Sequence, residues 1–361
     1  MPLFQKTNPC VKKIIRMIET GGPVSLATFM TEALTGEHGY YKRNADPLGK
    51  DGDFTTSPEI SQMFGELIGM WAVDQYRKLN YPLEFALCEI GPGRGTLMAD
   101  ALRGTAKISK SLTQAKLYLC ETNPLLRDKQ KIVLKNYAPA WIEDLKQLPN
   151  LPVIFIANEF FDALPVEQVI HDGKQWHTRK IGYNNDNKNF HFMAAAENFD
   201  PAPIADMLPP DDPMAGDIFE YSPESWRWAN QMIHQIRTYG GSALIIDYGH
   251  LQSGYGDTFQ AVMKHEKIDP LAHPGDADLT CHVDFSALRK IVKKSGLHVH
   301  DYTTQGEFLK RCGIETRLQQ LMKAATPAQQ ESLQSGMHRL TLPSQMGSLF
   351  KVLSFSSTAA A

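Results

Sequence analysis

The sequence predicts an α/β fold built around a mostly parallel β-sheet, and three observations support this. Short apolar runs alternate with helical patterns from residue 84 onward, which is typical of strands joined by helical crossovers. Most of these runs are too apolar for a strand that faces water, so they are expected to be central strands. A glycine-rich turn directly follows the first run. The expected strands are 85–90, 116–120, 153–157, 242–246, 297–302 and 349–355.

Additions to this sheet are expected at the N-terminus and in the middle of the chain. Residues 1–80 form a predicted helical extension, with helical spacing over 11–34 and a long irregular loop over 36–57. A helix is expected to begin at Thr56-Ser57-Pro58-Glu59, where a hydroxyl cap precedes a proline and a glutamate. The sheet domain then comprises 81–170 and 240–361, and residues 171–239 form an insertion that serves as a substrate or dimer subdomain.

Composition excludes several classes of protein. The 361 residues include 37 basic and 40 acidic side chains, a formal net charge of -3, which offers no basic field for nucleic acid. No apolar run approaches the ~18 residues of a membrane helix, so membrane insertion is not expected. The five cysteines lack any C-x-x-C pair and stand mostly in apolar runs, as reduced core residues do. A folded enzyme of a reducing compartment is the expectation.

The glycine-rich turn over residues 89–95 predicts a ligand-binding loop between a strand and a helix. Glycines at positions 91, 93 and 95 allow the backbone to approach a ligand closely. A dinucleotide fingerprint requires a third glycine where this chain has Thr96, which weakens the nicotinamide hypothesis. A nucleoside-triphosphate loop requires a lysine that is absent at the necessary spacing.

The pattern E-x-G-x-G-x-G resembles motif I of class I S-adenosylmethionine methyltransferases. That resemblance implies a Rossmann-like sheet of seven strands whose last strand is antiparallel. An acid before the glycines suits a cationic ligand, and Glu121 at the next strand end is the candidate for the ribose hydroxyls. The expected cofactor residues are Glu89, Gly91, Gly93, Gly95, Thr96, Glu121, Asp144 and Asn158.

Further strings are similar to the MidA family (DUF185), a group of protein arginine methyltransferases that includes mitochondrial complex I assembly factors. The strings span nearly the whole chain. They are GYY at 39–41, GDFTTSPEIS at 52–61, FGE at 64–66, NEFFDALP at 158–165, IDYGH at 246–250, GDT at 256–258 and ADLTCHVDF at 277–285. The resemblance implies symmetric ω-N methylation of an arginine on a respiratory-complex subunit, with S-adenosylmethionine as the cofactor.

The chemistry of arginine methylation indicates which residues to examine. A guanidinium has a pKa above ~12, so carboxylates must orient it toward the methyl donor. Glu159 is the first catalytic candidate, because ligands bind at the carboxyl ends of strands in open α/β sheets. Asn158 and Asp247 are the other two. The alternatives are that Glu159 caps a helix and that Asp247 serves only as a turn acid.

Six residues are expected at the substrate or in a lid over the cofactor: Tyr40, Asp53, Ser57, Glu59, Phe160 and Asp162. Phe160 is expected to wall a flat cationic group. Asp162 has the alternative of capping a helix. No metal is expected, because the histidines lack metal-ligand spacing.

Alternatives to catalysis on a protein arginine stay open at this point. The chain is either an enzyme or an assembly factor that binds the cofactor and a partner protein without efficient transfer. A nicotinamide oxidoreductase is the less favoured class, and methylation of a small molecule is a further option. We expect a cytoplasmic protein in a bacterium or a mitochondrial matrix protein in a eukaryote, and a homodimer as the assembly to test.

Overall fold

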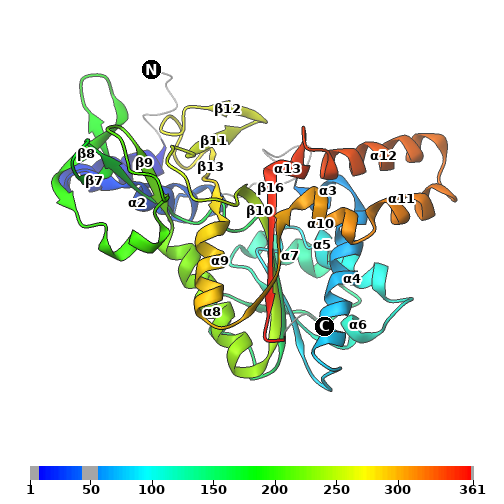
Figure 1. The fold of residues 1–361 in the computed structure, drawn as a ribbon. Coiled ribbons are helices and arrows are strands. Elements are labelled where there is room, and N and C mark those ends of the chain that lie inside the picture. The colour runs from blue at the N-terminus through cyan, green and yellow to red at the C-terminus, as the bar shows by residue number, and fades with distance from the viewer. Residues whose placement is uncertain (1–7, 43–55, 359–361) are drawn as a thin grey trace.

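The computed structural model describes residues 8–42 and 56–358. Its centre is an eight-stranded sheet (Figure 1) in which seven strands lie in the order β15-β16-β10-β5-β2-β3-β4, while β14 pairs with the end of β10. The strands are β2 (Ala86–Ile90), β3 (Lys116–Cys120), β4 (Ala140–Ile142), β5 (Val153–Asn158), β10 (Gly241–His250), β14 (Val283–Asp284), β15 (His298–Thr304) and β16 (Phe350–Ser356).

Strand direction agrees with the predicted class I methyltransferase topology. The pairs from β4 through β10 are parallel, and β16 is antiparallel to both β10 and β15. The six expected strands are present with ends that differ by one or two residues, except that β10 continues to His250. Strand β4 was not predicted, because three residues are too few to show a periodic pattern.

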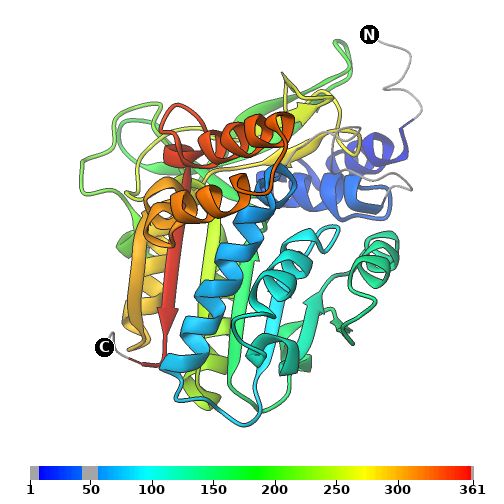
Figure 2. The ribbon, with the colours of Figure 1, turned by 90° about the vertical axis from the view of Figure 1, so that its right-hand side faces the viewer.

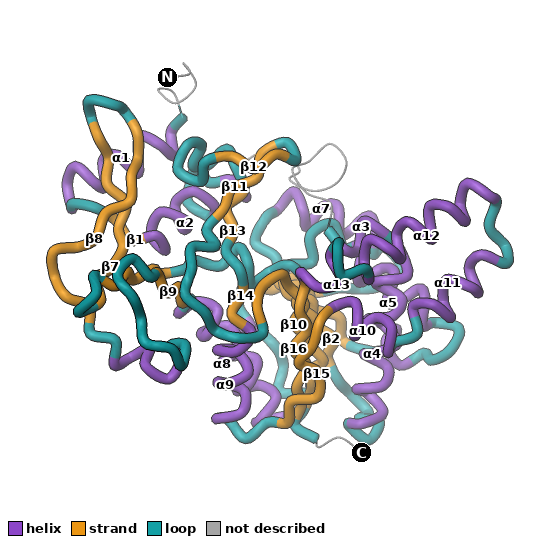
Figure 3. Tube along the Cα trace, turned by 45° about the horizontal axis from the view of Figure 1, so that its top comes forward, coloured by secondary structure: helices purple, strands orange, loops and turns teal. Residues whose placement is uncertain are grey.

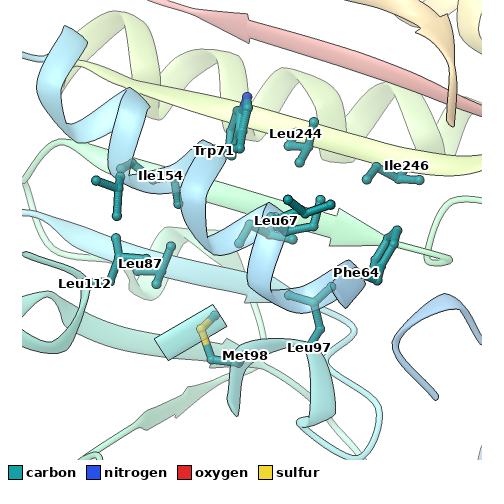
Figure 4. Close-up of a cluster of buried hydrophobic side chains, with 14 of the residues drawn as sticks. Phe64, Leu67, Trp71, Leu87, Leu97, Met98, Leu112, Ile154, Leu244 and Ile246 are labelled. Carbon is teal, nitrogen blue, oxygen red and sulfur yellow. The ribbon is translucent and has the colours of Figure 1, made fainter. Parts of the chain in front are cut away.

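Alternate residues of the strands face two separate cores. Ile154 and Ile156 of β5 pack with the helices on one side, whereas Val153 and Phe155 pack with those on the other. This is the two-residue period of a strand buried on both faces, and it explains why the strands are apolar without interruption. Figure 4 shows Trp71 of α4 above the strand residues Ile154 and Leu244.

Helices cover both faces of the sheet. The long helix α4 lies along one face, as Figure 2 shows, and α8 and α9 pack against the other. These helices and their connecting neighbours are α4 (Gln62–Lys78), α5 (Thr96–Thr105), α6 (Ser111–Gln114), α7 (Pro124–Val133), η3 (Leu145–Gln147), α8 (Pro223–Tyr239) and α9 (Phe285–Lys294). The helix predicted after Asp284 is α9, and the Asp284 side chain caps it by accepting from the Ala287 N–H at 3.0 Å.

A second, antiparallel sheet lies on one side of the central sheet (Figure 3). The two N-terminal helices pack on it, since Leu26 and Phe29 share a core with Ile181 and Phe190. The strands of this sheet are β1 (Val24–Ser25), β6 (Glu167–His171), β7 (Trp176–Asn184), β8 (Asn189–Phe199) and β9 (Ile218–Tyr221). The helices of the same two segments of the chain are α1 (Pro9–Gly21), α2 (Leu26–Leu34), η2 (Tyr40–Lys42) and η4 (Ala202–Met207). The helices expected over 11–34 are α1 and α2.

This arrangement suggests different limits for the insertion. Strand β6 belongs to the second sheet, while α8 packs against the central sheet through Trp228, Met232 and Ile236. We therefore propose 167–222 as the insertion in place of 171–239. A small third sheet adjoins it, made of β11 (Gln260–Met263), β12 (Glu266–Ile268) and β13 (Asp278–Thr280).

Four helices follow β15, and α11 and α12 project away from the second sheet (Figure 1). They are not separate from the body, because Phe308, Ile314 and Leu340 share the core that α4 forms with the central sheet. They are α10 (Gln305–Arg311), α11 (Ile314–Met322), α12 (Pro327–Thr341) and α13 (Met346–Leu349). Within the described ranges, no helix is both long and apolar enough to cross a membrane. All five cysteines are free, and four of them are buried.

The helix predicted to begin at Thr56 is divided in two. Helix α3 (Ser57–Ile60) is one turn long, and Thr56 makes no side-chain capping bond to it. Ser61 is extended and caps α4 by accepting from the Met63 N–H at 3.3 Å. The predicted helix start at Thr56 is confirmed, but this helix ends after one turn and a second helix begins at Gln62. Because the first N–H groups of a helix have no partner within it, the Ser57 N–H can contact a side chain elsewhere.

Candidate functional site

A cavity lies at the carboxyl edge of the central sheet, with about 1240 Å³ of empty space, part of it open to solvent. The ends of β2, β3 and β5 form its floor, and Thr35, Tyr41, Thr56, Pro58 and Glu59 of the N-terminal extension line it as well. Parallel strands present their carboxyl ends on one edge, which is where open α/β sheets bind ligands. The extension predicted as separate from the core is therefore part of this site.

The glycine turn joins β2 to α5 along one wall of the cavity. Gly91, Gly93 and Gly95 all have positive φ values, of 66°, 52° and 83°, which favour glycine. A Cβ atom on Gly91 would lie 2.8 Å from the Phe160 ring, so even alanine does not fit without movement. Gly91 and Gly93 line the cavity, whereas Gly95 lies behind it at the start of α5.

Glu89 precedes this turn and faces the cavity from the floor. Its side chain is buried, with 3% of the residue exposed, and its Oε2 atom has no hydrogen-bond partner. Burial raises the pKa of Glu89 to about 8. A buried carboxyl with an unused oxygen at a ligand cavity fits a cationic group that would supply the missing partner.

Glu121 follows β3 and lines the cavity beside the turn. Its Oε1 atom accepts from the Asn123 N–H at 2.7 Å, and its Oε2 atom accepts from Gln130 Nε2 at 3.3 Å. Burial raises the pKa of Glu121, and those two donors counteract the rise. Each carboxylate oxygen keeps a lone pair for a further donor, as two ribose hydroxyls require.

Asn158 ends β5 next to the glycine turn, and Glu159 directly follows the strand. Glu159 has φ 50°, an unusual conformation for a residue with a side chain, and its N–H donates to Ile246 O at 2.9 Å. Its Oε1 atom accepts from the Ser57 N–H at 2.8 Å and from Asn158 Nδ2 at 3.0 Å. Asn158 Oδ1 is buried without a partner. The two side chains thus fix each other's orientation at the cavity floor.

Burial raises the pKa of Glu159, although the hydrogen bonds from Ser57 and Asn158 oppose the rise. A carboxyl group with a raised pKa is suited to taking a proton from a bound ligand near neutral pH. Phe160 also lines the cavity, and its ring meets Trp228 edge-on at a centroid distance of 5.0 Å. These rings form an aromatic wall next to the acid.

Asp247 and Asp162 do not line the cavity. Asp247 Oδ2 accepts from the backbone N–H groups of Phe160, Phe161 and Asp162 at 2.8–3.2 Å, and Oδ1 accepts from the Tyr248 N–H at 2.9 Å. Both of its oxygens are therefore engaged with backbone beneath the site. The structure places Asp247 as a support for the turn after Glu159, which corresponds to the turn-acid alternative.

Other expected residues occupy the rim or lie elsewhere. Glu59 accepts from Thr96 Oγ1 at 2.6 Å and lies 3.8 Å from Arg94 Nη1, which connects α3 to the glycine turn.

Tyr41 lines the cavity, and the predicted Tyr40 is buried in the core of the N-terminal helices. Asp144 caps η3 by accepting from the Lys146 N–H at 2.8 Å, while its neighbour Glu143 lines the cavity. Asp53 lies outside the described residues.

Some lining residues had no separate signal in the sequence. Glu143 directly follows the short strand β4, Tyr41 lies on the 3-10 helix η2, and Trp228 lies on α8. Gln130 was missed too, although it touches both the turn and Glu121. The helical pattern of residues 124–133 gave no reason to separate this glutamine from its polar neighbours.

The lining of the cavity is mainly acidic. Among the described lining residues a single cationic side chain, Arg94, stands against five carboxylic acids: Glu59, Glu89, Glu121, Glu143 and Glu159. Carboxylates around a concave site attract cations. S-adenosylmethionine carries a sulfonium and an ammonium group against one carboxylate, so its net charge suits this lining.

Comparison with known proteins agrees with the geometry. The family described as "Putative S-adenosyl-L-methionine-dependent methyltransferase" matches residues 67–303. The Drosophila melanogaster protein arginine methyltransferase NDUFAF7 homolog, mitochondrial, is 36% identical, over 95% of this chain and 83% of its own. The human protein arginine methyltransferase NDUFAF7, mitochondrial, is 32% identical, over 97% of this chain and 83% of its own.

A solved structure shows the same fold. The crystal structure of a Burkholderia thailandensis protein bound to S-adenosyl-homocysteine superposes with a TM-score of 0.84, covers 98% of this chain and 93% of its own, and is 24% identical in sequence. The family match removes the nicotinamide oxidoreductase alternative, which Thr96 already disfavoured. The fold, the glycine turn and the family match agree, and the chain belongs to this family of S-adenosylmethionine-dependent methyltransferases.

Proposed function

We propose that the protein transfers a methyl group from S-adenosylmethionine to an arginine side chain of a protein. The observation that carries this proposal is the pair of unpartnered acceptors, Glu89 Oε2 and Asn158 Oδ1, on adjacent strands of an acidic cavity. Two buried acceptors without donors are costly unless ligands supply the donors. The names of the relatives, which are protein arginine methyltransferases, support a guanidinium as the acceptor group.

Glu89, Glu121 and the glycine turn are proposed to hold the cofactor. Glu89 pairs with a cationic group of the ligand, Glu121 accepts from the ribose hydroxyls, and Gly91 and Gly93 keep the wall free of side chains. Thr96 acts indirectly, because its hydroxyl is already donated to Glu59. Gly95 and Asp144 support the turn and η3 from outside the lining. The bound cofactor supplies an electrophilic methyl group, and the chain's residues position the acceptor against it.

Asn158 and Glu159 are proposed as the catalytic residues at the acceptor end. Asn158 Oδ1 accepts a hydrogen bond from an N–H of the guanidinium group. This bond aligns the lone pair of the nitrogen that receives the methyl group with the methyl donor. Glu159 stays fixed by Ser57 and takes the proton that the acceptor nitrogen loses, as its raised pKa allows. The aromatic pair Phe160 and Trp228 forms a wall for a flat cation.

Calorimetric titration with S-adenosylmethionine, with NADH titrated in parallel, tests the cofactor assignment. Saturable binding of the former alone is expected. Transfer of a labelled methyl group to arginine-bearing protein extracts, followed by amino-acid analysis, then tests catalysis. Binding without transfer would favour the assembly-factor alternative, and labelled lysine or a labelled small molecule would contradict the arginine assignment.

The product of methylation, the substrate protein, the oligomeric state and the cellular location are proposed from the family resemblance. We propose symmetric dimethylation of a subunit of respiratory complex I or a related protein, and a homodimer as the assembled form. The relatives are named as mitochondrial. A matrix location is accordingly proposed for a eukaryotic source and a cytoplasmic one for a bacterial source. Mass spectrometry of methylarginine isomers and light scattering of the purified protein test the first two points.

A further inference from the structure

Gln130 on α7 touches both parts of the proposed cofactor site. The residue is fully buried, at 0% exposure. Its Nε2 atom donates to Gly93 O at 2.7 Å and to Glu121 Oε2 at 3.3 Å. Its stem lies against the turn as well, since a Cβ atom on Gly95 would be 3.4 Å from Gln130 Cγ. One side chain therefore connects the glycine turn after β2 to the acid after β3.

Trp141 fixes which way this amide faces. Its indole Nε1 donates to Gln130 Oε1 at 2.7 Å, and an indole N–H can only donate. The amide oxygen must then face Trp141, so the amide nitrogen must face Gly93 and Glu121. A flipped amide would direct its NH₂ group at the indole N–H and leave the Gly93 carbonyl without a donor.

The consequence for Glu121 is a defined orientation. With Gln130 on Oε2 and the Asn123 N–H on Oε1, the carboxylate is held from both sides in a plane set by the protein. Each of its oxygens keeps a lone pair for a further donor, and the residue lines the cavity. A carboxylate held in this way pays little ordering cost when it accepts two neighbouring hydroxyl groups.

We propose that Gln130, locked by Trp141, is the positioning residue that orients Glu121 and the glycine turn for the ribose of the cofactor. This rests on the proposed function, because it assumes that Glu121 accepts from ribose hydroxyls. Gln130 does not itself line the cavity. It acts through Glu121 and Gly93, so its effect should depend on the ribose hydroxyls of the ligand rather than on the ligand as a whole.

Calorimetry with two ligands tests the inference on the full chain. The ligands are S-adenosyl-homocysteine and its analogue without the ribose 2′-hydroxyl. For the unaltered protein, loss of the hydroxyl should weaken binding about tenfold. Gln130→Leu should weaken S-adenosyl-homocysteine binding by about 10- to 100-fold, by analogy with metal sites that lose a group orienting a ligating side chain. In this variant the ratio of the affinities for the two ligands, with and without the 2′-hydroxyl, should fall to below about threefold.

Two further variants keep the test decisive. Gln319→Leu, on an exposed position of α11, is the matched control and should leave both affinities unchanged. Trp141→Phe keeps an aromatic side chain but removes the pyrrole part of the indole together with its N–H, so Gln130 Oε1 loses its donor. This variant should shift the ratio of the two affinities in the same direction by a smaller factor. If Gln130→Leu has no cooperative melting transition, Trp141→Phe decides the question alone.

The outcomes separate this inference from the proposed function. No binding of S-adenosyl-homocysteine to the unaltered protein would overturn the cofactor assignment itself. Normal binding with an unchanged hydroxyl effect in Gln130→Leu would overturn only the role of Gln130. Equal weakening of both ligands would also overturn it, because that result indicates general support of the turn without orientation of Glu121.

Discussion

The two halves of the cavity are built in different ways. The proposed cofactor half comes from segments between Glu89 and Glu143, and Gln130 joins them by hydrogen bonds across 9 positions to Glu121 and across 37 positions to Gly93. The acceptor half depends on distant residues: Ser57 contacts Glu159 across 102 positions, and Asp247 contacts the 160–162 turn across 85 to 87. The proposed cofactor half is thus assembled over shorter distances along the chain than the proposed acceptor half.

Gly91 is where the two halves meet, so its substitution should have the largest effect. In Gly91→Val the Cβ atom would lie 2.8 Å from Phe160, at a φ of 66° that valine disfavours. Saturable binding of S-adenosylmethionine should disappear in calorimetry. Gly254→Val is the control, since nothing lies within 4 Å of a Cβ there. Retained binding in Gly91→Val would contradict the placement of the cofactor at this turn.

Glu159→Gln should separate the halves. The side chain keeps its size but loses its capacity to take a proton, so methyl transfer should fall by about 10²- to 10⁴-fold. The affinity for S-adenosylmethionine should change by less than about threefold, because this residue belongs to the acceptor half. Transfer is measured with labelled cofactor, and Glu84→Gln at an exposed ion pair is the control. Normal turnover would move the catalytic role to another residue.

Asp247→Asn should test the long-range support of the acceptor half. One acceptor oxygen is replaced by an NH₂ group, so either the Tyr248 N–H or the three N–H groups of the 160–162 turn lose their partner. The free energy of unfolding should fall by about 2 kcal/mol, measured in urea. Methyl transfer should fall with it while cofactor affinity stays within about twofold. Asp186→Asn, exposed in the β7–β8 loop, should change neither quantity.

The pH dependence of cofactor binding should report on Glu89. Burial raises its pKa from 4.5 to about 8, so the folded protein without ligand binds a proton that the unfolded chain has released. This group's contribution to stability is therefore present below about pH 4.5 and is lost as the pH rises toward about 8. A cationic ligand favours the ionised form instead.

Affinity for S-adenosylmethionine should accordingly increase by up to about tenfold per pH unit below pH 8 and then level off. Glu89→Gln should bind more weakly at pH 8 and lose this dependence. Proton release on binding, measured by calorimetry in buffers of different ionisation enthalpy, gives a second readout. An unaltered pH profile in the variant would show that Glu89 does not pair with the ligand's cation.

The smallest effect is expected at the contact between α3 and the glycine turn. Thr96→Val removes the hydroxyl that donates to Glu59 at 2.6 Å and keeps the shape of the side chain. Loss of one hydrogen bond to a carboxylate should weaken cofactor binding by about fivefold. Thr113→Val, exposed on α6, is the comparison variant. A loss as large as that of Gly91→Val would mean that α3 is as important to the cofactor half as the turn itself.

Most of the fold and the cofactor half were predictable because their signals are local. An apolar run predicts a buried strand, and the spacing of Gly91, Gly93 and Gly95 predicts a ligand-binding turn. Glu121 was predictable from its place after the second strand. Strand β4 and the helical hairpin of α11 and α12 carry weaker patterns and were not predicted.

The sequence by itself determined the parallel sheet, the ligand turn and the identity of Glu89, Glu121, Asn158 and Glu159 as residues at strand ends. The tertiary structure decided that α3 is a separate turn whose Ser57 N–H holds Glu159, that Asp247 supports the backbone instead of lining the cavity, and that Gln130 orients Glu121. The physical reason is that periodicity and turn chemistry act over a few residues, whereas a hydrogen bond between distant segments depends on their packing.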